Sequence, residues 1–314
     1  MDNNELRLGR LHQCTFEQAL ELKKRGFEGY HAEMAIHYPG FARPPAPTGV
    51  PVPGELDRML DGFGTEGIRP ELSVVCFAGD KPVGFVFIAV KQADGKKLVW
   101  NGGTGVFPEY RGKGIAKAMM LEAGKVIREQ EADHAFLEVV AKNEHAIRAY
   151  QKGGFEIADR LIGMTCAGTG AAFFDRPDGL DGIRLVHDAP SAVSKLPFYR
   201  SEAAWWCMWH NMKTGQSVTA FDPEGKEIGY ALFNRAYGAG GELKSVVLKQ
   251  CELSAACADR EAVFRMLLAE AYGPFDPAVT YKTADLSMSN PEVVRLHEAA
   301  GFITNYEQYL MMMK

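Results

Sequence analysis

Several features are scarce in this sequence, and each scarcity argues against a class of protein. The six cysteines are scattered with no CxxC spacing, which disfavours a disulfide framework or a zinc site. The eight histidines show no metal-ligand spacing either. Lys and Arg number 35 against 40 Asp and Glu, so the basic excess that nucleic-acid binding requires is missing. We therefore expect no metal and no nucleic-acid partner.

Long apolar runs are missing as well. The longest uncharged stretch of note, residues 161–174, is too short and too rich in glycine to span a bilayer. Residues 1–7 lack the apolar core of a signal peptide. These features predict a cytoplasmic protein that does not enter a membrane, and no pattern indicates an oligomeric state.

What the chain does contain is an internal repeat. Its 314 residues exceed the size at which a single core usually stops growing. The segment Asn143–Phe155 reappears as Asn290–Phe302, at an offset of 147 residues without a gap. Such a repeat predicts two similar domains in tandem. We place them at residues 1–167 and 182–314, joined by a glycine-rich linker at residues 168–181.

The hydrophobic pattern of the first domain predicts strands mixed with helices. Strands are expected at residues 5–13, 71–78, 82–90, 97–106, 134–140 and 161–165, with a further strand opening at Phe155. Helices are expected after Thr15, at residues 55–63 and 114–130, and after Asn143. Six prolines within residues 39–53 predict a long irregular loop, which suits a lid over a binding site or a plain surface excursion.

A glycine-containing turn, Arg111 to Ala116, is built to hold phosphate. Gly112 and Gly114 let the main chain approach a bulky anion, and the helix that follows points its unpaired N–H groups and positive dipole end at that anion. Arg111 adds a planar donor, and Lys113 adds a mobile positive charge. The turn is therefore the candidate binding site of the first domain.

The second copy lacks this turn. At the offset of 147 residues, Arg111 becomes Ala258, and the two glycines become Asp259 and Glu261. A pyrophosphate would there meet like charge and side-chain bulk. We expect the anionic ligand in the first domain only.

These residues resemble the GNAT superfamily of acyl-CoA-dependent N-acetyltransferases. The phosphate motif of that family is matched by Arg111, Gly114 and Ala116. Its later signature is matched by Asn143, Ala146, Ile147, Tyr150, Gly154 and Phe155. The resemblance implies an α+β fold, an α/β/α sandwich whose mixed, mostly antiparallel sheet splays between its fourth and fifth strands. This fold would be present twice, with the C-terminal copy degenerate.

The resemblance also implies how acetyl-CoA, the co-substrate, is held. Its pantetheine arm would pair with the strand that ends at Val106. Its pyrophosphate would sit on the amides of the turn, namely Gly112, Lys113, Gly114, Ile115 and Ala116. Asn143 is similar to the family residue that contacts pantetheine, although it also suits a helix N-cap, and both roles can hold at once.

The implied chemistry is direct attack of an amine on the thioester. Tyr150 matches the family position that often protonates the departing thiolate, although a helix residue facing a sheet can equally be a core aromatic. The strand at residues 97–106 carries no carboxylate to serve as base. Glu138 on the next strand is one candidate base, with a solvated surface role as its alternative, and a water held by Asn101 or Thr104 is another.

The function implied is an acetyl-CoA-dependent N-acetyltransferase acting on a primary amine of a small molecule or peptide. An alternative is a non-catalytic acyl-CoA-binding sensor or interaction module. The missing carboxylate on the fourth strand favours the sensor, whereas Tyr150 within a full motif favours the enzyme.

Overall fold

The chain folds into two compact units. The computed structural model describes residues 5–38, 54–167, 174–175, 177 and 182–313. Unit 1 comprises residues 1–158 and 310–314, and unit 2 comprises residues 159–309. The predicted proline-rich loop at residues 39–53 and most of the predicted linker at residues 168–181 lie outside the described residues.

The division between the units differs from the predicted boundary after residue 167 because of one long strand. The sequence predicts separate strands at Phe155 and at residues 161–165, but β6 runs without a break from Phe155 to Cys166. From Leu161 onward this strand pairs with strands of unit 2, at Leu161–Ser287 and Ile162–Leu286. Residues 159–167 therefore belong to unit 2.

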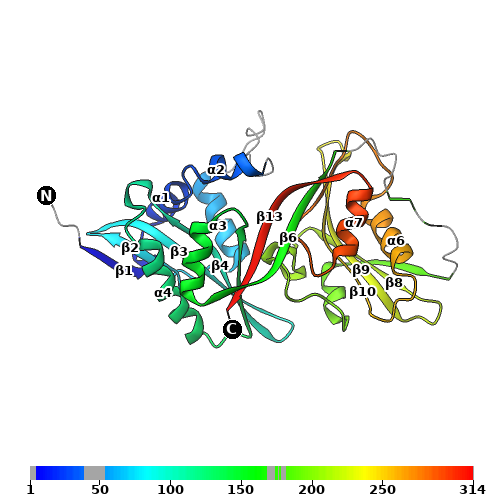
Figure 1. The fold of residues 1–314 in the computed structure, drawn as a ribbon, viewed down its shortest axis with the longest axis horizontal. Coiled ribbons are helices and arrows are strands. Elements are labelled where there is room, and N and C mark those ends of the chain that lie inside the picture. Colours follow the sequence, from blue (N-terminus) through cyan, green and yellow to red (C-terminus); the bar gives the residue numbers. More distant parts are fainter. Residues whose placement is uncertain (1–4, 39–53, 168–173, 176, 178–181, 314) are drawn as a thin grey trace. The chain divides into compact units, whose positions relative to one another are not determined.

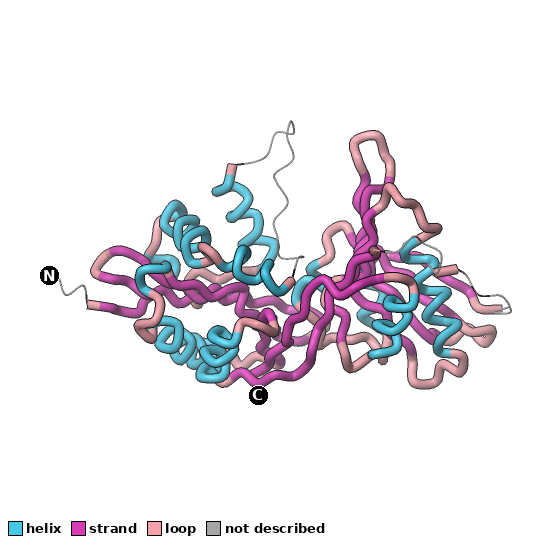
Figure 2. Tube along the Cα trace, turned by 45° about the horizontal axis from the view of Figure 1, so that its top comes forward, coloured by secondary structure: helices cyan, strands magenta, loops and turns pink. Residues whose placement is uncertain are grey.

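Unit 1 is a mixed sheet between two layers of helices, as Figures 1 and 2 show. Its strands are β1 (Leu6–Arg10), β2 (Val74–Ala78), β3 (Lys81–Ala93), β4 (Lys96–Val106) and β5 (His134–Val140). Its helices are α1 (Phe16–Gly26), α2 (Tyr30–His37), α3 (Glu55–Glu66), α4 (Ile115–Glu129) and α5 (Glu144–Gly153). Neighbours from β1 to β4 are antiparallel, and β5 is parallel to β4. The sheet continues from β5 into the end of β13 (Phe302–Met313), so the predicted mixed, mostly antiparallel sheet is confirmed.

The two helical layers are set by alternation along β3. A Cβ on Gly26, at the end of α1, would meet the ring of Phe85, whereas a Cβ on Gly84 would meet Met119 of α4. Because adjacent strand residues point to opposite faces, α1 and α4 cover opposite faces of the sheet. Glycine at these positions lets each helix approach the strands closely.

Local side-chain hydrogen bonds set the start of α1 and the end of β1. Thr15 accepts a hydrogen bond from the backbone N–H of Gln18, whose side chain accepts one from the N–H of Thr15, and this capping box starts α1. The predicted strand at residues 5–13 is shorter than expected. It ends at Arg10 because the Arg10 N–H turns to the Gln13 side chain and residues 11–13 form a 3-10 helix.

Unit 2 repeats the strand order of unit 1. Its own strands are β7 (Arg184–Asp188), β8 (Gly215–Phe221), β9 (Glu227–Tyr237), β10 (Leu243–Leu253), β11 (Thr280–Thr283) and β12 (Leu286–Ser287). Its α-helices are α6 (Arg260–Tyr272) and α7 (Pro291–Ala299). Strands β7 to β10 are antiparallel, and β11 is parallel to β10, as β5 is to β4. The predicted tandem fold is therefore confirmed.

Short 3-10 helices lie in unit 2 where unit 1 has α1 to α3. They are Pro190–Lys195, Trp205–Cys207 and Trp209–Asn211. Phe174, which falls inside the predicted linker, stacks on Tyr272 and is buried in the core of unit 2. At least this part of the predicted linker is thus part of the domain.

Candidate active site

The site begins where β4 and β5 separate. The two strands pair at Leu98–His134, Val99–Ala135 and Trp100–Phe136. Beyond Trp100, β4 continues to Val106 and β5 to Val140, with no further pairing between these described residues. The predicted splay of the fourth and fifth strands is confirmed. It leaves backbone N–H and C=O groups of both strands facing a gap.

A bulge in β4 decides which side chains line that gap. Phe87 pairs with Gly103 and Ile88 pairs with Asn101, so Gly102 is an extra residue in the ladder. A Cβ on Gly102 would lie 2.7 Å from the Trp100 ring and 2.9 Å from Ile68, which explains glycine there. The extra residue reverses the alternation and brings Asn101 and Thr104 to the same face.

Tyr150 of α5 lies against this bulge. Its side chain is 8% exposed and hydrogen-bonded to the Thr104 side chain. Burial raises the pKa of Tyr150, and the bond to Thr104 partly lowers it again. Tyr30 of α2 lies close by, since its pKa is raised by burial and by Tyr150. A phenol in this setting keeps its proton at neutral pH and can donate it.

Glu138 of β5 enters the gap from the other face of β4. It stands two residues beyond the last paired residue of β5, and its Oε2 accepts a hydrogen bond of 2.7 Å from Trp100 Nε1. Trp100 and Asn101 are neighbours in β4 and so point to opposite faces. Glu138 is half-buried, and a tryptophan holds its carboxylate, which is not the setting of a solvated surface side chain.

The phosphate turn has open space in front of it. Gly114 caps the N-terminus of α4 with a φ of 78°, and Gly112 has a φ of 75°. No neighbouring atom lies within 4 Å of the position that a Cβ would take on either glycine. The first turn of α4, from Ile115 through Ala116, carries amides without an intrahelical acceptor. The structure therefore leaves room for a ligand beside both glycines.

The Arg111 guanidinium, which the sequence predicts to bind phosphate, donates to backbone carbonyl oxygens of its own unit. Its Nε donates to the carbonyl oxygen of Val106 at 3.0 Å, and one terminal nitrogen donates to the carbonyl oxygens of Glu28 at 2.9 Å and Gly26 at 3.2 Å. Arg111 therefore ties the turn to the end of α1. Lys113 is exposed and lies 5.0 Å from the centre of the Tyr110 ring.

Asn143 acts as the N-cap of α5. Its Oδ1 accepts a hydrogen bond of 3.1 Å from the backbone N–H of Ala146. The helix-cap interpretation of Asn143 is confirmed, and this cap sets the start of the helix that carries Tyr150.

The corresponding turn in unit 2 carries a carboxylate at the amide end of its helix. Asp259 caps α6 by accepting a hydrogen bond from the N–H of Ala262 at 3.3 Å. Arg260, beside it, donates two hydrogen bonds, of 2.9 and 2.7 Å, to Glu292 of α7. The positive end of α6 is thus already matched with carboxylates.

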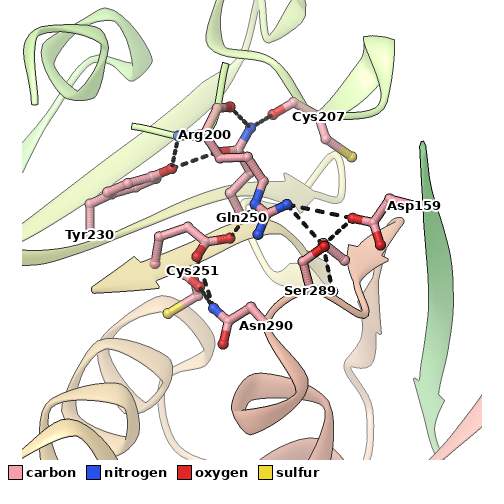
Figure 3. A network of polar contacts seen from close by, with 10 residues as sticks. Asp159, Arg200, Cys207, Tyr230, Gln250, Cys251, Ser289 and Asn290 are labelled. Atoms are coloured by element: carbon pink, nitrogen blue, oxygen red, sulfur yellow. Dashed lines mark hydrogen bonds and ion pairs between the residues drawn. The ribbon is translucent and has the colours of Figure 1, made fainter. Parts of the chain in front are cut away.

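A polar network bridges the gap between β10 and β12, as Figure 3 shows. The Arg200 guanidinium donates to Glu252 of β10 at 2.7 Å and to the Ser287 hydroxyl of β12 at 2.9 Å. It also lies 3.5 Å from a carboxylate oxygen of Asp159, which accepts a hydrogen bond from Ser287. Asn290, the counterpart of Asn143, donates to the second oxygen of Glu252 at 2.9 Å.

His297 stands at the Tyr150 position of unit 2 and is fully buried. Its Nδ1 bonds the carbonyl oxygen of Val293 at 2.7 Å, and its Nε2 bonds the Tyr272 hydroxyl at 2.9 Å. Burial lowers the pKa of His297 to about 4, so the ring is neutral. This setting is that of a structural residue in the core of unit 2.

Neither the pairing of Trp100 with Glu138 nor the bridge made by Arg200 was anticipated from the sequence. A tryptophan two residues before Gly102 was the only local signal for the first. In the parts of the chain that the structure describes, no group of three His, Cys, Asp or Glu residues could hold a metal ion. The same parts contain no helix long and apolar enough to cross a membrane.

Parts of the sequence are similar to known acetyltransferases. Residues 43–155 match the model of the acetyltransferase (GNAT) family. A segment of 50 residues is 46% identical to streptothricin acetyltransferase from Streptomyces lavendulae, covering 16% of this chain and 26% of that protein. The match thus spans about a quarter of the relative's length.

Solved structures resemble the whole chain. A tandem GNAT protein from the clavulanic acid biosynthesis pathway is 17% identical with a TM-score of 0.57, and the match covers 98% of each chain. A GCN5-related N-acetyltransferase from Sphaerobacter thermophilus is 14% identical with a TM-score of 0.58, covering 99% of this chain and 96% of that one. At these identities the likeness concerns the fold.

Proposed function

We propose, on the match of residues 43–155 to the acetyltransferase (GNAT) family model, that the protein transfers the acetyl group of acetyl-CoA to a primary amine. The observation that carries the proposal is the gap between β4 and β5, which has Tyr150 on one face and Glu138 on the other. The partly matched relative is named for streptothricin, which supports a small-molecule acceptor, and a peptide amine suits the same chemistry.

Acetyl-CoA is held in unit 1 by main-chain groups. The open turn at Gly112 and Gly114 and the first amides of α4 receive the pyrophosphate. The unpaired edge of β4 receives the pantetheine, with the Asn143 amide at the start of α5 beside it. Arg111 contributes by fixing the turn to α1, and Lys113 contributes positive charge at the exposed rim.

The chain supplies an acid and a base on opposite sides of the gap. Glu138 takes a proton from the acceptor ammonium, and the amine then attacks the thioester carbonyl carbon. As the C–N bond forms and the C–S bond breaks, Tyr150 gives its proton to the departing sulfur. The attacking nitrogen, which still carries one proton more than the amide product, releases that proton to water, and Glu138 passes its own proton to solvent before the next turnover. Because burial raises the pKa of Tyr150, the phenol is protonated and ready to act at neutral pH.

Unit 2 is proposed to bind no acetyl-CoA and to serve a structural role. The amide end of α6 is capped by Asp259, and Arg200 bridges the strands that would have to receive pantetheine. Asn290 is engaged by Glu252. Opening this cleft would require breaking several charge-assisted hydrogen bonds.

An acyl-CoA-binding sensor remains the second candidate, because β4 carries no carboxylate. One experiment separates the two. The full chain is incubated with acetyl-CoA and a panel of polyamines, amino sugars and peptides, and released thiol is measured while mass spectrometry follows the acceptor. The enzyme releases thiol in proportion to acetylated amine. Tight acetyl-CoA binding, measured by calorimetry, with no acceptor-dependent thiol release would favour the sensor.

A further inference from the structure

Two polar residues of the β4 bulge converge on the candidate acid. Asn101 is 5% exposed, and its Nδ2 donates to Thr104 Oγ1 at 3.1 Å. Thr104 in turn shares a side-chain hydrogen bond with Tyr150. In a regular strand, Asn101 and Thr104 would point to opposite faces, so the extra residue Gly102 is what brings them together.

We propose that Thr104, held by Asn101, is a positioning residue that orients the Tyr150 hydroxyl and stabilises the phenolate formed when Tyr150 protonates the leaving sulfur. The inference rests on the proposed function and assigns a new role to two residues of that site. The Tyr150 O–H bond breaks as the S–H bond forms, and the Thr104 hydroxyl then donates to the phenolate. Tyr150 regains its proton from water before the next turnover.

The Asn101 side chain is held so that Thr104 can play this part. Asn101 Oδ1 accepts a hydrogen bond of 3.0 Å from the N–H of Gly103, which locks the amide onto the bulge. The Thr104 hydroxyl lies 3.3 Å from the same Oδ1. The Thr104 proton therefore has two acceptors within reach, Asn101 in the resting state and Tyr150 once its oxygen is charged.

Met120 of α4 covers this group from above the sheet. Its sulfur lies 3.8 Å from Asn101 Nδ2 and 3.7 Å from Thr104 Oγ1. Dry surroundings strengthen hydrogen bonds to a developing charge. Because α4 also begins at the phosphate turn, one helix both offers amides to the cofactor and shields the hydroxyl pair.

The second repeat provides an internal comparison. Strand β10 keeps a register shift between Leu248 and Gln250, at the place of the β4 bulge. At the offset of 147 residues, Asn101, Thr104 and Tyr150 are replaced by Leu248, Cys251 and His297. The bulge is thus kept in both units, whereas the polar trio is present only in the unit with the open phosphate turn. Packing alone does not require the trio.

The test compares Thr104→Val, which removes the hydroxyl at equal volume, with Thr104→Ser, which keeps it. We expect Thr104→Val to lower kcat about 10- to 100-fold with an unchanged Kd for acetyl-CoA. Thr104→Ser should recover most of the rate. In a Tyr150→Phe background, adding Thr104→Val should cost little more, because the hydroxyl acts only through Tyr150.

Each outcome has a distinct meaning. Equal and additive losses from Thr104→Val in both backgrounds, or a loss that Thr104→Ser fails to recover, would overturn the positioning role while leaving the acetyltransferase proposal intact. Absence of any acceptor-dependent turnover by the wild-type chain would overturn the proposed function, and this role with it. Circular dichroism and calorimetric acetyl-CoA binding confirm that each variant is folded.

Discussion

Trp100 donates its indole hydrogen to Glu138 across the point where β4 and β5 separate, at 2.7 Å. The hydrogen bond holds a carboxylate of β5 beside β4, which has no carboxylate of its own. Glu138 is therefore our candidate for the base that β4 does not supply.

The first prediction concerns this pair. Glu138→Gln should lower kcat about 100-fold, because the amide cannot take a proton from the acceptor. Trp100→Phe should lower kcat less, since the carboxylate remains but loses the group that orients it. Acetyl-CoA affinity, measured by calorimetry, should change in neither variant. Glu129→Gln, an exposed carboxylate on α4, is the control. A Glu138→Gln enzyme with the wild-type rate would remove Glu138 as the base.

The second prediction concerns the phosphate turn. Gly114→Ala forces a side chain into a left-handed conformation and should cost about 1–2 kcal/mol of folding stability. It should also weaken acetyl-CoA binding, because the first amides of α4 shift. Gly95→Ala is a matched control, since Gly95 has a φ of 74° and equally open surroundings in the β3–β4 turn. We expect the same loss of stability there with unchanged affinity. Equal affinities for acetyl-CoA in the two variants would show that the turn does not bind the cofactor.

The third prediction concerns stoichiometry. Calorimetric titration should find one acetyl-CoA per chain, because Asp259 and Arg200 occupy the two places in unit 2 where a cofactor would bind. Gly114→Ala should weaken that single binding event, whereas Asp259→Ala should leave it unchanged. Two equivalent sites in the wild-type chain would contradict the structural role of unit 2.

The fourth prediction concerns pH. His297 has a pKa near 4 in the folded protein and about 6.5 when unfolded, so the unfolded chain binds the extra proton. Above pH 6.5 the ring is neutral in both states, and its titration does not change the free energy of unfolding. As pH falls from 6.5 toward 4, protonation of the unfolded chain lowers the free energy of unfolding by about 3 kcal/mol. Asp285, whose pKa burial raises to about 6, acts in the opposite direction.

The His297 contribution is isolated by comparing wild type with His297→Gln. The difference in their free energies of unfolding, measured with urea between pH 4 and 7.5, should shift by this amount in favour of the variant as pH falls. A difference that does not change with pH would show that His297 titrates normally.

Local patterns explain what could be predicted from the sequence. Asn143 predicted the start of α5, because the capping signal lies within a few residues of its effect. The partners of Arg111 could not be predicted in this way. Gly26 and Glu28 lie more than 80 residues earlier in the chain, and only the packing of α1 brings them to the turn. The bridge from Arg200 to Glu252 and Ser287 depends likewise on tertiary packing.

The division of β13 between the two units has a consequence for synthesis. Unit 1 includes residues 310–314, although almost all of it comes from the first 158 residues. A nascent chain can therefore fold most of the sheet of unit 1 early, but that sheet lacks its last strand segment until unit 2 has been translated. During this interval an edge of the sheet stays exposed, which is the condition in which strands pair with other chains. A fragment that stops at residue 167 should show the same exposure permanently.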